Sequence, residues 1–119
     1  MDFNTHKYIH QFLEQSSTFY PDKVALIYQK QRITYKEINN QANILAHKLI
    51  EWGITKGERV VLILENSLEY VVSYYGALKA GAVIVPLSTD IKESGLEFIV
   101  TETKPKIVIT SFLILSLFA

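Results

Sequence analysis

Cysteine is absent from all 119 residues of this chain. Disulfide bonds and thiolate metal sites are therefore excluded, which fits a reducing compartment. The amino-terminal residues also lack the order of a basic segment followed by an apolar one that marks a secretory signal. We therefore expect a cytoplasmic protein.

An excess of charge is missing as well, and so is a long apolar run. Twelve Lys and Arg residues balance twelve Asp and Glu residues, so the formal net charge is zero, whereas a nucleic-acid-binding domain usually carries a basic excess. The longest apolar run, IVITSFLILSLFA at residues 107–119, is shorter than the roughly 20 residues of a spanning helix. We expect no nucleic-acid partner and no membrane span. Surface association of residues 107–119 with a membrane is the weakest alternative, because flanking basic residues are lacking.

Clustered glycines are also lacking, since the five glycines, at positions 53, 57, 76, 81 and 95, are all isolated. A phosphate cradle needs consecutive small residues whose backbone amides converge, and neither G-x-G-x-x-G nor G-x-x-x-x-G-K-[ST] occurs. The nearest candidate is PLSTD at residues 86–90, where Ser88 and Thr89 can face a phosphate at a helix start. Such residues more commonly cap the following helix, here together with Asp90, and we favour that interpretation.

The remaining candidate side chains form no catalytic constellation. His6 and His10 are four residues apart and can share a helix face, but no third metal ligand accompanies them, so we favour an exposed helix surface. The third histidine is His47. Three carboxylates at expected helix starts are assigned to capping, and three tyrosines on one helix to packing at the core edge: Glu37, Glu69, Glu93, Tyr70, Tyr74 and Tyr75. We therefore assign no catalytic, cofactor-binding or metal-binding residue.

What is present begins with a helix and a hairpin. Thr5 can cap a first helix in which Ile9, Phe12 and Leu13 share one face, and the turn YPDK at residues 20–23 ends it. Two β-prone runs, residues 24–28 and 32–35, flank a polar turn and predict a small hairpin.

The second helix has a start signal, an apolar face and a stop signal. Thr34 and Glu37 form a capping box, and Gly53 supplies a left-handed stop for which Ile54 makes the hydrophobic contact. The predicted stripe, at alternating spacings of four and three, comprises Ile38, Ala42, Leu45, Leu49 and Trp52.

The rest of the chain alternates strands and helices. RVVLIL at residues 59–64 reads as a buried strand, followed by a helix that Asn66 or Ser67 can cap and Gly81 ends. Its apolar positions are Leu68, Val71, Val72, Tyr75 and Leu78. AVIVP at residues 82–86 predicts a second buried strand. A third helix, with Asp90 and Glu93 at a box-like start, precedes the strand KIVIT; it carries the stripe Leu96, Ile99 and Val100, and Pro105 bars its continuation.

This order predicts an α/β fold in which right-handed crossovers build a parallel sheet with flanking helices, preceded by a helix and a small β-hairpin. Three stretches then resemble a known family: ITYKEI at residues 33–38, the segment ending in LKAGAVIVPLS at residues 56–88, and KPKIVIT at residues 104–110. They are similar to the first two core motifs and the following strand of adenylate-forming (AMP-binding) enzymes. That superfamily contains acyl-CoA synthetases, peptide-synthetase adenylation domains and luciferases.

The resemblance implies the N-terminal part of an acetyl-CoA-synthetase-like domain. In the parent reaction a carboxylate and ATP give an acyl-adenylate, whose acyl group passes to the thiol of CoA or a carrier protein; ATP, Mg and that thiol are implied for the parent only. The motif around Gly81 would be architectural, with Val83 and Val85 filling the core. The sequence AVIVPLST favours an acyl-CoA or acyl-carrier ligase over a peptide-synthetase module.

The family's phosphate loop, acidic ribose ligand and catalytic lysine have no position in these 119 residues. We therefore expect a truncated N-terminal piece that is inactive alone, with a partial adenylation subdomain at residues 1–110 and an apolar tail at residues 111–119. The alternative is a non-catalytic split subunit or interaction module that pairs with a second polypeptide carrying the nucleotide site. Self-association through an uncovered strand edge is also expected.

Overall fold

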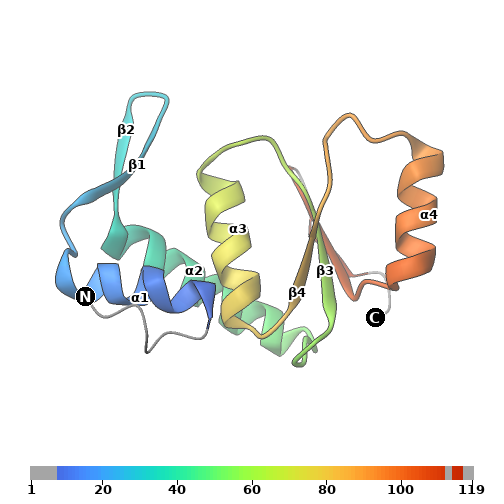
Figure 1. The fold of residues 1–119 in the computed structure, drawn as a ribbon, viewed down its shortest axis with the longest axis horizontal. Coiled ribbons are helices and arrows are strands. Elements are labelled where there is room, and N and C mark those ends of the chain that lie inside the picture. The colour runs from blue at the N-terminus through green and yellow to red at the C-terminus, as the bar shows by residue number, and fades with distance from the viewer. Residues whose placement is uncertain (1–7, 112–113, 117–119) are drawn as a thin grey trace.

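The computed structural model describes residues 8–111 and 114–116. It has a helix and hairpin at one end and an α/β unit at the other (Figure 1). The elements are α1 (Ile9–Phe19), β1 (Val24–Tyr28), β2 (Gln31–Thr34), α2 (Tyr35–Glu51), β3 (Arg59–Ile63), α3 (Leu68–Lys79), β4 (Val83–Pro86), α4 (Glu93–Thr103), β5 (Ile107–Thr110) and β6 (Ile114–Ser116).

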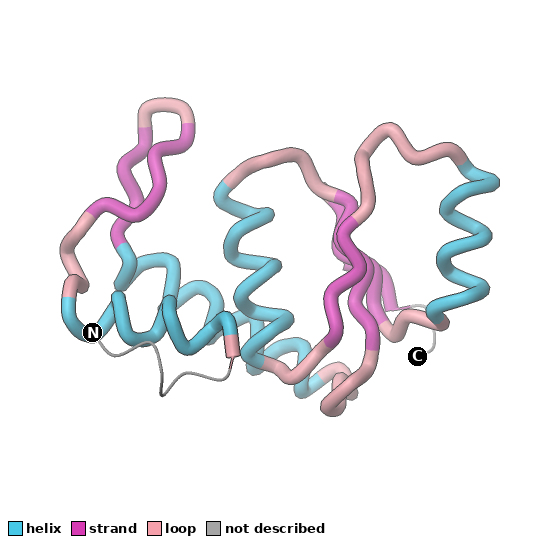
Figure 2. Tube along the Cα trace, viewed as in Figure 1, coloured by secondary structure: helices cyan, strands magenta, loops and turns pink. Residues whose placement is uncertain are grey.

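The larger sheet has the strand order β4-β3-β5-β6, with β3 parallel to both β4 and β5. Figure 2 shows α3 on one side of this sheet and α4 on the other. The predicted α/β fold with a parallel sheet is therefore confirmed. Residues 114–116, which belong to the expected apolar tail at residues 111–119, pair antiparallel with β5, and Ile109 lies opposite Ile114.

The central strand β3 is buried on both faces, as its continuous apolar sequence predicts. Val60, Val61 and Leu62 have no exposed surface. On one face of the sheet, Val60 and Leu62 of β3 pack with Leu49 of α2 and Ala77 of α3 in the main hydrophobic cluster. A second cluster, formed by α1, the hairpin and the start of α2, contains Leu13, Ile33, Ile38 and Ala42.

The expectation that β4 is a buried strand is wrong. β4 lies at the edge of the sheet, beside β3 alone. Val83 is 49% exposed and Val85 only partly buried, so neither fills the core as predicted. A run of apolar residues does not encode strand order. Pro86, which lacks an N–H group, does suit an edge position.

Helix α2 begins and ends as the sequence predicts. The Thr34 hydroxyl accepts from the Glu37 amide at 3.2 Å, and the Glu37 carboxylate accepts from the Thr34 amide at 2.9 Å. At the other end Gly53 has φ +100°, and Ile54 donates to the carbonyl of Leu49 at 3.0 Å, which is a Schellman motif. Trp52 is not part of the buried stripe: it caps the helix and is 47% exposed. Ile38, Ala42 and Leu49 of the predicted stripe are buried, Leu45 is only partly buried, and Ala46 is buried in addition.

The same device joins α3 to β4. Gly81, at φ +86°, donates to the carbonyl of Leu78, and Ala82 donates to that of Ala77, both at 3.0 Å. The helix therefore turns directly into the strand. A Cβ on Gly81 would also lie 3.4 Å from the Cα of Lys56, so the position requires glycine for its conformation and leaves little space around it.

The buried face of α3 differs from the predicted one. Ser73, Gly76 and Ala77 are buried, whereas the larger predicted residues, such as Val72 and Leu78, are only partly buried. α3 packs extensively on α2, and a Cβ added to Gly76 would lie 2.8 Å from Cδ2 of Leu45. Small residues are needed where two helices approach this closely.

The start of the first helix and that of α4 lie later than expected. α1 begins at Ile9, after Tyr8, whereas Thr5 and His6 lie outside the described residues. α4 begins at Glu93 after Lys92, without a side-chain cap, so the prediction that Asp90 caps it is wrong. No residue of α4 is fully buried.

Within the described ranges no helix is both long and apolar enough to cross a membrane.

Replacing Gly76 with alanine tests the close approach of α2 and α3. We expect Gly76→Ala to lower the free energy of unfolding by about 1–2 kcal/mol, because overpacking outweighs the roughly 1 kcal/mol gain in helix propensity. Urea denaturation measures the change. In the double variant Leu45→Ala/Gly76→Ala the loss should be smaller than the sum of the two single losses by about 1 kcal/mol. Additive losses would contradict the proposed contact.

Candidate functional site

A shallow cavity of about 350 Å³ lies at the carboxyl ends of β3 and β4. Ligands of open α/β sheets bind at this end of the strands, so this cavity is the natural candidate site. Its lining residues come from the end of β4, the loops after the two strands and the first turn of α3: Leu64, Glu65, Asn66, Tyr70, Pro86, Leu87, Ser88 and Thr89.

The cavity contains both hydroxyl residues that the sequence singled out, but neither lies at a helix start. Ser88 organises its own turn, since its hydroxyl accepts from the amide of Asp90 at 3.1 Å and its carbonyl from that of Ile91 at 3.1 Å. Thr89 donates to the Glu65 carboxylate at 2.7 Å. α4 begins only at Glu93, so the interpretation that Ser88 and Thr89 cap this helix is wrong. The alternative, that they face a phosphate at a helix start, loses its premise for the same reason.

The charged side chain that lines this cavity is the Glu65 carboxylate. A carboxylate opposes the binding of a phosphate beside it, because like charges repel. Asn66 and Tyr70 add polar groups but no cation. Over residues 8–111 and 114–116, no three His, Cys, Asp or Glu side chains converge to hold a metal ion. The residues that line the cavity thus supply no cation for a phosphate.

The histidines are separated. His6 lies outside the described residues, and His47 is exposed on α2. The ring of His10 stacks on that of Tyr8, with centroids 5.6 Å apart. Burial lowers the pKa of His10; the Glu14 carboxylate raises it and the Lys79 ammonium lowers it.

Of the three carboxylates assigned to capping, only Glu37 caps its helix, and the three tyrosines pack at the core edge as expected. Glu37 completes the capping box, and Glu69 and Glu93 lie in the first turns of α3 and α4. A negative charge in the first turn interacts favourably with the helix dipole. Tyr70 and Tyr74 stack and border the main hydrophobic cluster. Tyr75, whose pKa is raised chiefly by burial, borders the second cluster.

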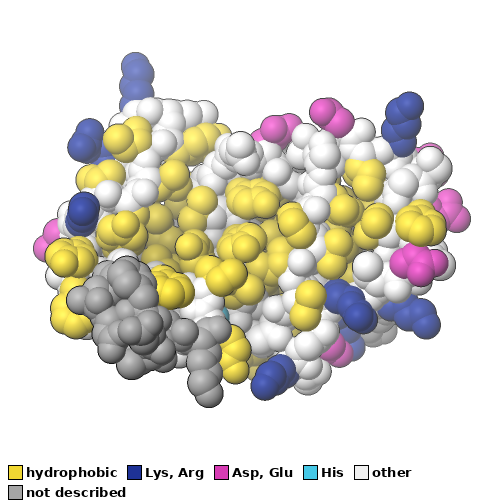
Figure 3. All heavy atoms as spheres, viewed as in Figure 1, with side chains coloured by type: hydrophobic (Ala, Val, Ile, Leu, Met, Phe, Trp, Pro, Cys, Tyr) yellow, Lys and Arg dark blue, Asp and Glu magenta, His cyan; other side chains and the backbone are white. Residues whose placement is uncertain are grey.

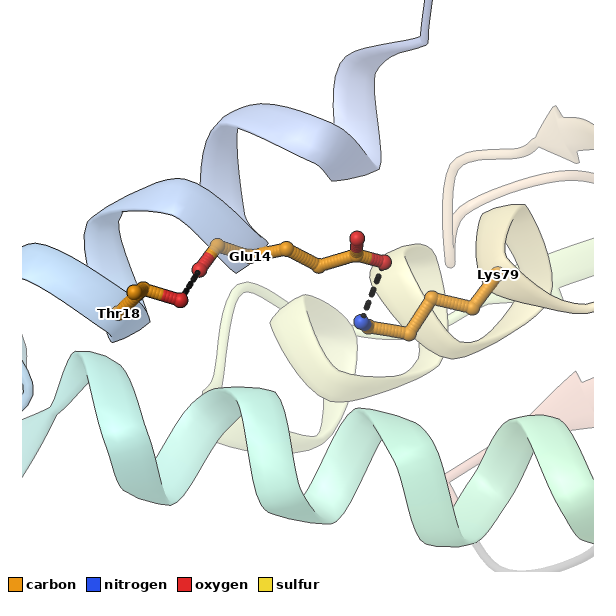
Figure 4. Close-up of polar contacts among 3 residues, drawn as sticks. All are labelled: Glu14, Thr18 and Lys79. Atoms are coloured by element: carbon orange, nitrogen blue, oxygen red, sulfur yellow. Dashed lines mark hydrogen bonds and ion pairs between the residues drawn. The ribbon is translucent and has the colours of Figure 1, made fainter. Parts of the chain in front are cut away.

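An ion pair that sequence reasoning missed connects Lys79 to the first helix. Figure 4 shows the Glu14 carboxylate of α1 facing the Lys79 ammonium of α3, at 2.9 Å. The Lys79 side chain is only 7% exposed, while that of Glu14 is 46% exposed. Thr18 donates to the carbonyl of Glu14 at 3.0 Å. Sixty-five residues separate the partners, and no local pattern indicates such a distant contact.

Comparisons with known proteins find similar sequences and similar structures. A family model described as AMP-binding enzyme matches residues 13–117. Tyrocidine synthase 1 of Brevibacillus parabrevis is 35% identical over 104 residues, which are 87% of this chain and 10% of that protein. The Klebsiella oxytoca NpsA N-terminal subdomain, in complex with 3-hydroxybenzoyl-AMSN, superposes with a TM-score of 0.84 at 28% identity and covers 91% of this chain and 28% of its own. A Mycobacterium tuberculosis fatty acyl CoA synthetase superposes with a TM-score of 0.82 at 37% identity, and the match covers 87% of this chain and 21% of that protein. The chain thus spans a small part of each relative.

The ion pair between Glu14 and Lys79 should contribute to stability through the buried cation. We expect Glu14→Gln to lower the free energy of unfolding by about 1–2 kcal/mol, less than the roughly 3–5 kcal/mol of a fully buried pair, because Glu14 is half exposed. Lys79→Met, which removes the buried charge, should change stability by less than about 1 kcal/mol.

The matched control is Glu51→Gln, which breaks the exposed pair between Lys48 and Glu51 and should change stability by under about 0.5 kcal/mol. Chemical denaturation compares the three variants. Equal losses in Glu14→Gln and Glu51→Gln would show that burial of Lys79 is of no consequence.

The hydrogen bond between Thr89 and Glu65 should hold the two loops of the cavity together. We expect Thr89→Val to lower the unfolding free energy by about 0.5–1 kcal/mol and to speed amide hydrogen exchange at residues 86–92. Thr101→Val, at an exposed position of α4, is the control. Unchanged exchange in Thr89→Val would mean that the turn of Ser88 suffices to order the loop.

Proposed function

Because the chain belongs to the AMP-binding enzyme family, we propose that it forms part of the N-terminal subdomain of an AMP-forming acid–thiol ligase. In the proposed parent reaction the oxygen of a carboxylate attacks the α-phosphorus of ATP. An acyl-adenylate forms and pyrophosphate leaves. A thiol then displaces AMP to give a thioester.

The observation that carries this proposal is the likeness to N-terminal subdomains of adenylation enzymes over nearly all of the described chain. The three family-like stretches map onto structural positions: the capping box that begins α2, the Schellman turn between α3 and β4, and strand β5. These contacts fix the scaffold on which such a subdomain is built.

For the acceptor of the acyl group we propose only what the relatives have in common, a thiol. Tyrocidine synthase 1 and a Mycobacterium tuberculosis fatty acyl CoA synthetase both resemble this chain, so the proposal includes the thiol of CoA and that of a carrier protein. The stretch AVIVPLST supports an acyl-CoA or acyl-carrier ligase. The likeness to a fatty acyl CoA synthetase supports a carboxylic acid as the substrate class.

We propose that these 119 residues do not form an acyl-adenylate alone. They contain no Ser/Thr/Gly-rich loop ending in Pro-Lys-Gly, and the cavity at the carboxyl ends of β3 and β4 presents a carboxylate. A non-catalytic subunit that pairs with a second chain is the alternative. The exposed edge of β4 supports it, because unpaired strand edges invite partners.

A chimera tests the proposed function. Residues 9–116 replace the matching segment of the Mycobacterium tuberculosis fatty acyl CoA synthetase, and ATP–pyrophosphate exchange is measured with fatty acids. We expect the chimera to retain exchange within about tenfold, or roughly 1.4 kcal/mol in activation free energy, and the isolated chain to show none. A chimera that melts cooperatively but lacks exchange would contradict the proposal. Exchange by the isolated chain would contradict its inactivity.

A further inference from the structure

The opposite end of the sheet from the candidate cavity carries a group of basic side chains. Arg59, Lys104 and Lys106 line a hollow of about 370 Å³ together with Gly57 and Glu58. In Figure 3 several Lys and Arg side chains gather around this lower end of the sheet, where the parallel strands begin. We call the three cations the amino-edge surface.

The fold brings these cations together from two parts of the chain, the start of β3 and the loop between α4 and β5. Arg59 begins β3, and its carbonyl accepts from the amide of Lys106 at 2.8 Å, so the starts of β3 and β5 lie side by side. Lys104 follows α4 in a left-handed conformation, φ +49°. The Cε of Lys106 lies 3.7 Å from the position that a Cβ on Gly53 would take, so its aliphatic stem packs at the end of α2.

These charges have no counter-ion within the chain as far as the structure describes it. The ion pairs of the described residues join Lys48 to Glu51 and Lys79 to Glu14. Glu58, the one carboxylate in the hollow, accepts from the amide of Thr55 at 2.8 Å. Cations that converge on one hollow repel each other, and an anionic partner would relieve that repulsion.

We propose that the amino-edge surface docks the acidic side of a protein partner. Arg and Lys pair readily with carboxylates. Three cations match a few carboxylates, whereas a nucleic-acid site usually draws on a larger basic excess, and this chain has none. The surface lies at the end of the sheet opposite the candidate cavity, so a partner docked there leaves the carboxyl ends of the strands free.

Binding of an acidic peptide tests the proposal on the full chain. The probe is an octa-glutamate peptide, titrated at low and at high salt while two-dimensional NMR follows the backbone amides. We expect shifts centred on residues 57–59 and 104–106, and an affinity that falls as salt rises. The double variant Arg59→Glu/Lys104→Glu should bind at least tenfold more weakly; both side chains are exposed.

The control Lys30→Glu/Lys36→Glu makes the same change in net charge at two exposed positions elsewhere and should lose less than twofold. If the reversed variant fails to melt cooperatively, Arg59→Gln/Lys104→Gln replaces it, with a loss of at least threefold expected. Equal losses in the test and control variants, shifts away from these residues, or no binding would overturn the proposal. Tighter binding of a 12-nucleotide DNA or of inorganic phosphate would overturn the choice of a protein partner.

Discussion

The close approach of α2 and α3 is the contact on which the rest of the structure depends. Each helix contributes to both hydrophobic clusters, the one under the sheet and the one under α1 and the hairpin. The two parts of the chain are joined because Gly76 lets α3 lie directly on Leu45. Without that approach the sheet would lose the cover of one face, and the hairpin end would lose its attachment to the sheet.

The motif LKAG acquires a physical meaning from this packing. Leu78 provides a carbonyl for the Schellman turn, Ala80 is small enough to be buried, and Gly81 adopts the left-handed conformation that redirects the chain into β4. Lys79 reaches α1 and pairs with Glu14. A stop signal and a tertiary ion pair therefore share four consecutive residues.

Features set by neighbouring residues were predictable, and features set by distant ones were not. The capping box at Thr34 and the left-handed stops at Gly53 and Gly81 depend on a few adjacent residues, so their patterns are visible in the sequence. The edge position of β4, the pairing of β6 and the partner of Lys79 depend on strand order and helix placement. Ser88 and Thr89 lie between these cases: their hydroxyls form local and loop–loop bonds, but the helix they were expected to cap begins four residues beyond Thr89.

The two ends of the sheet differ in charge, and this difference constrains what each can bind. At the carboxyl ends a carboxylate already engaged by Thr89 opposes a phosphate; at the amino ends three cations remain without a carboxylate partner among the described residues. An ATP site in the proposed parent would therefore draw its cations and phosphate-binding amides from elements other than these. The described residues supply instead a rigid scaffold, fixed by two Schellman turns and one buried lysine, and a basic surface on the side remote from the strand ends where ligands of α/β sheets bind.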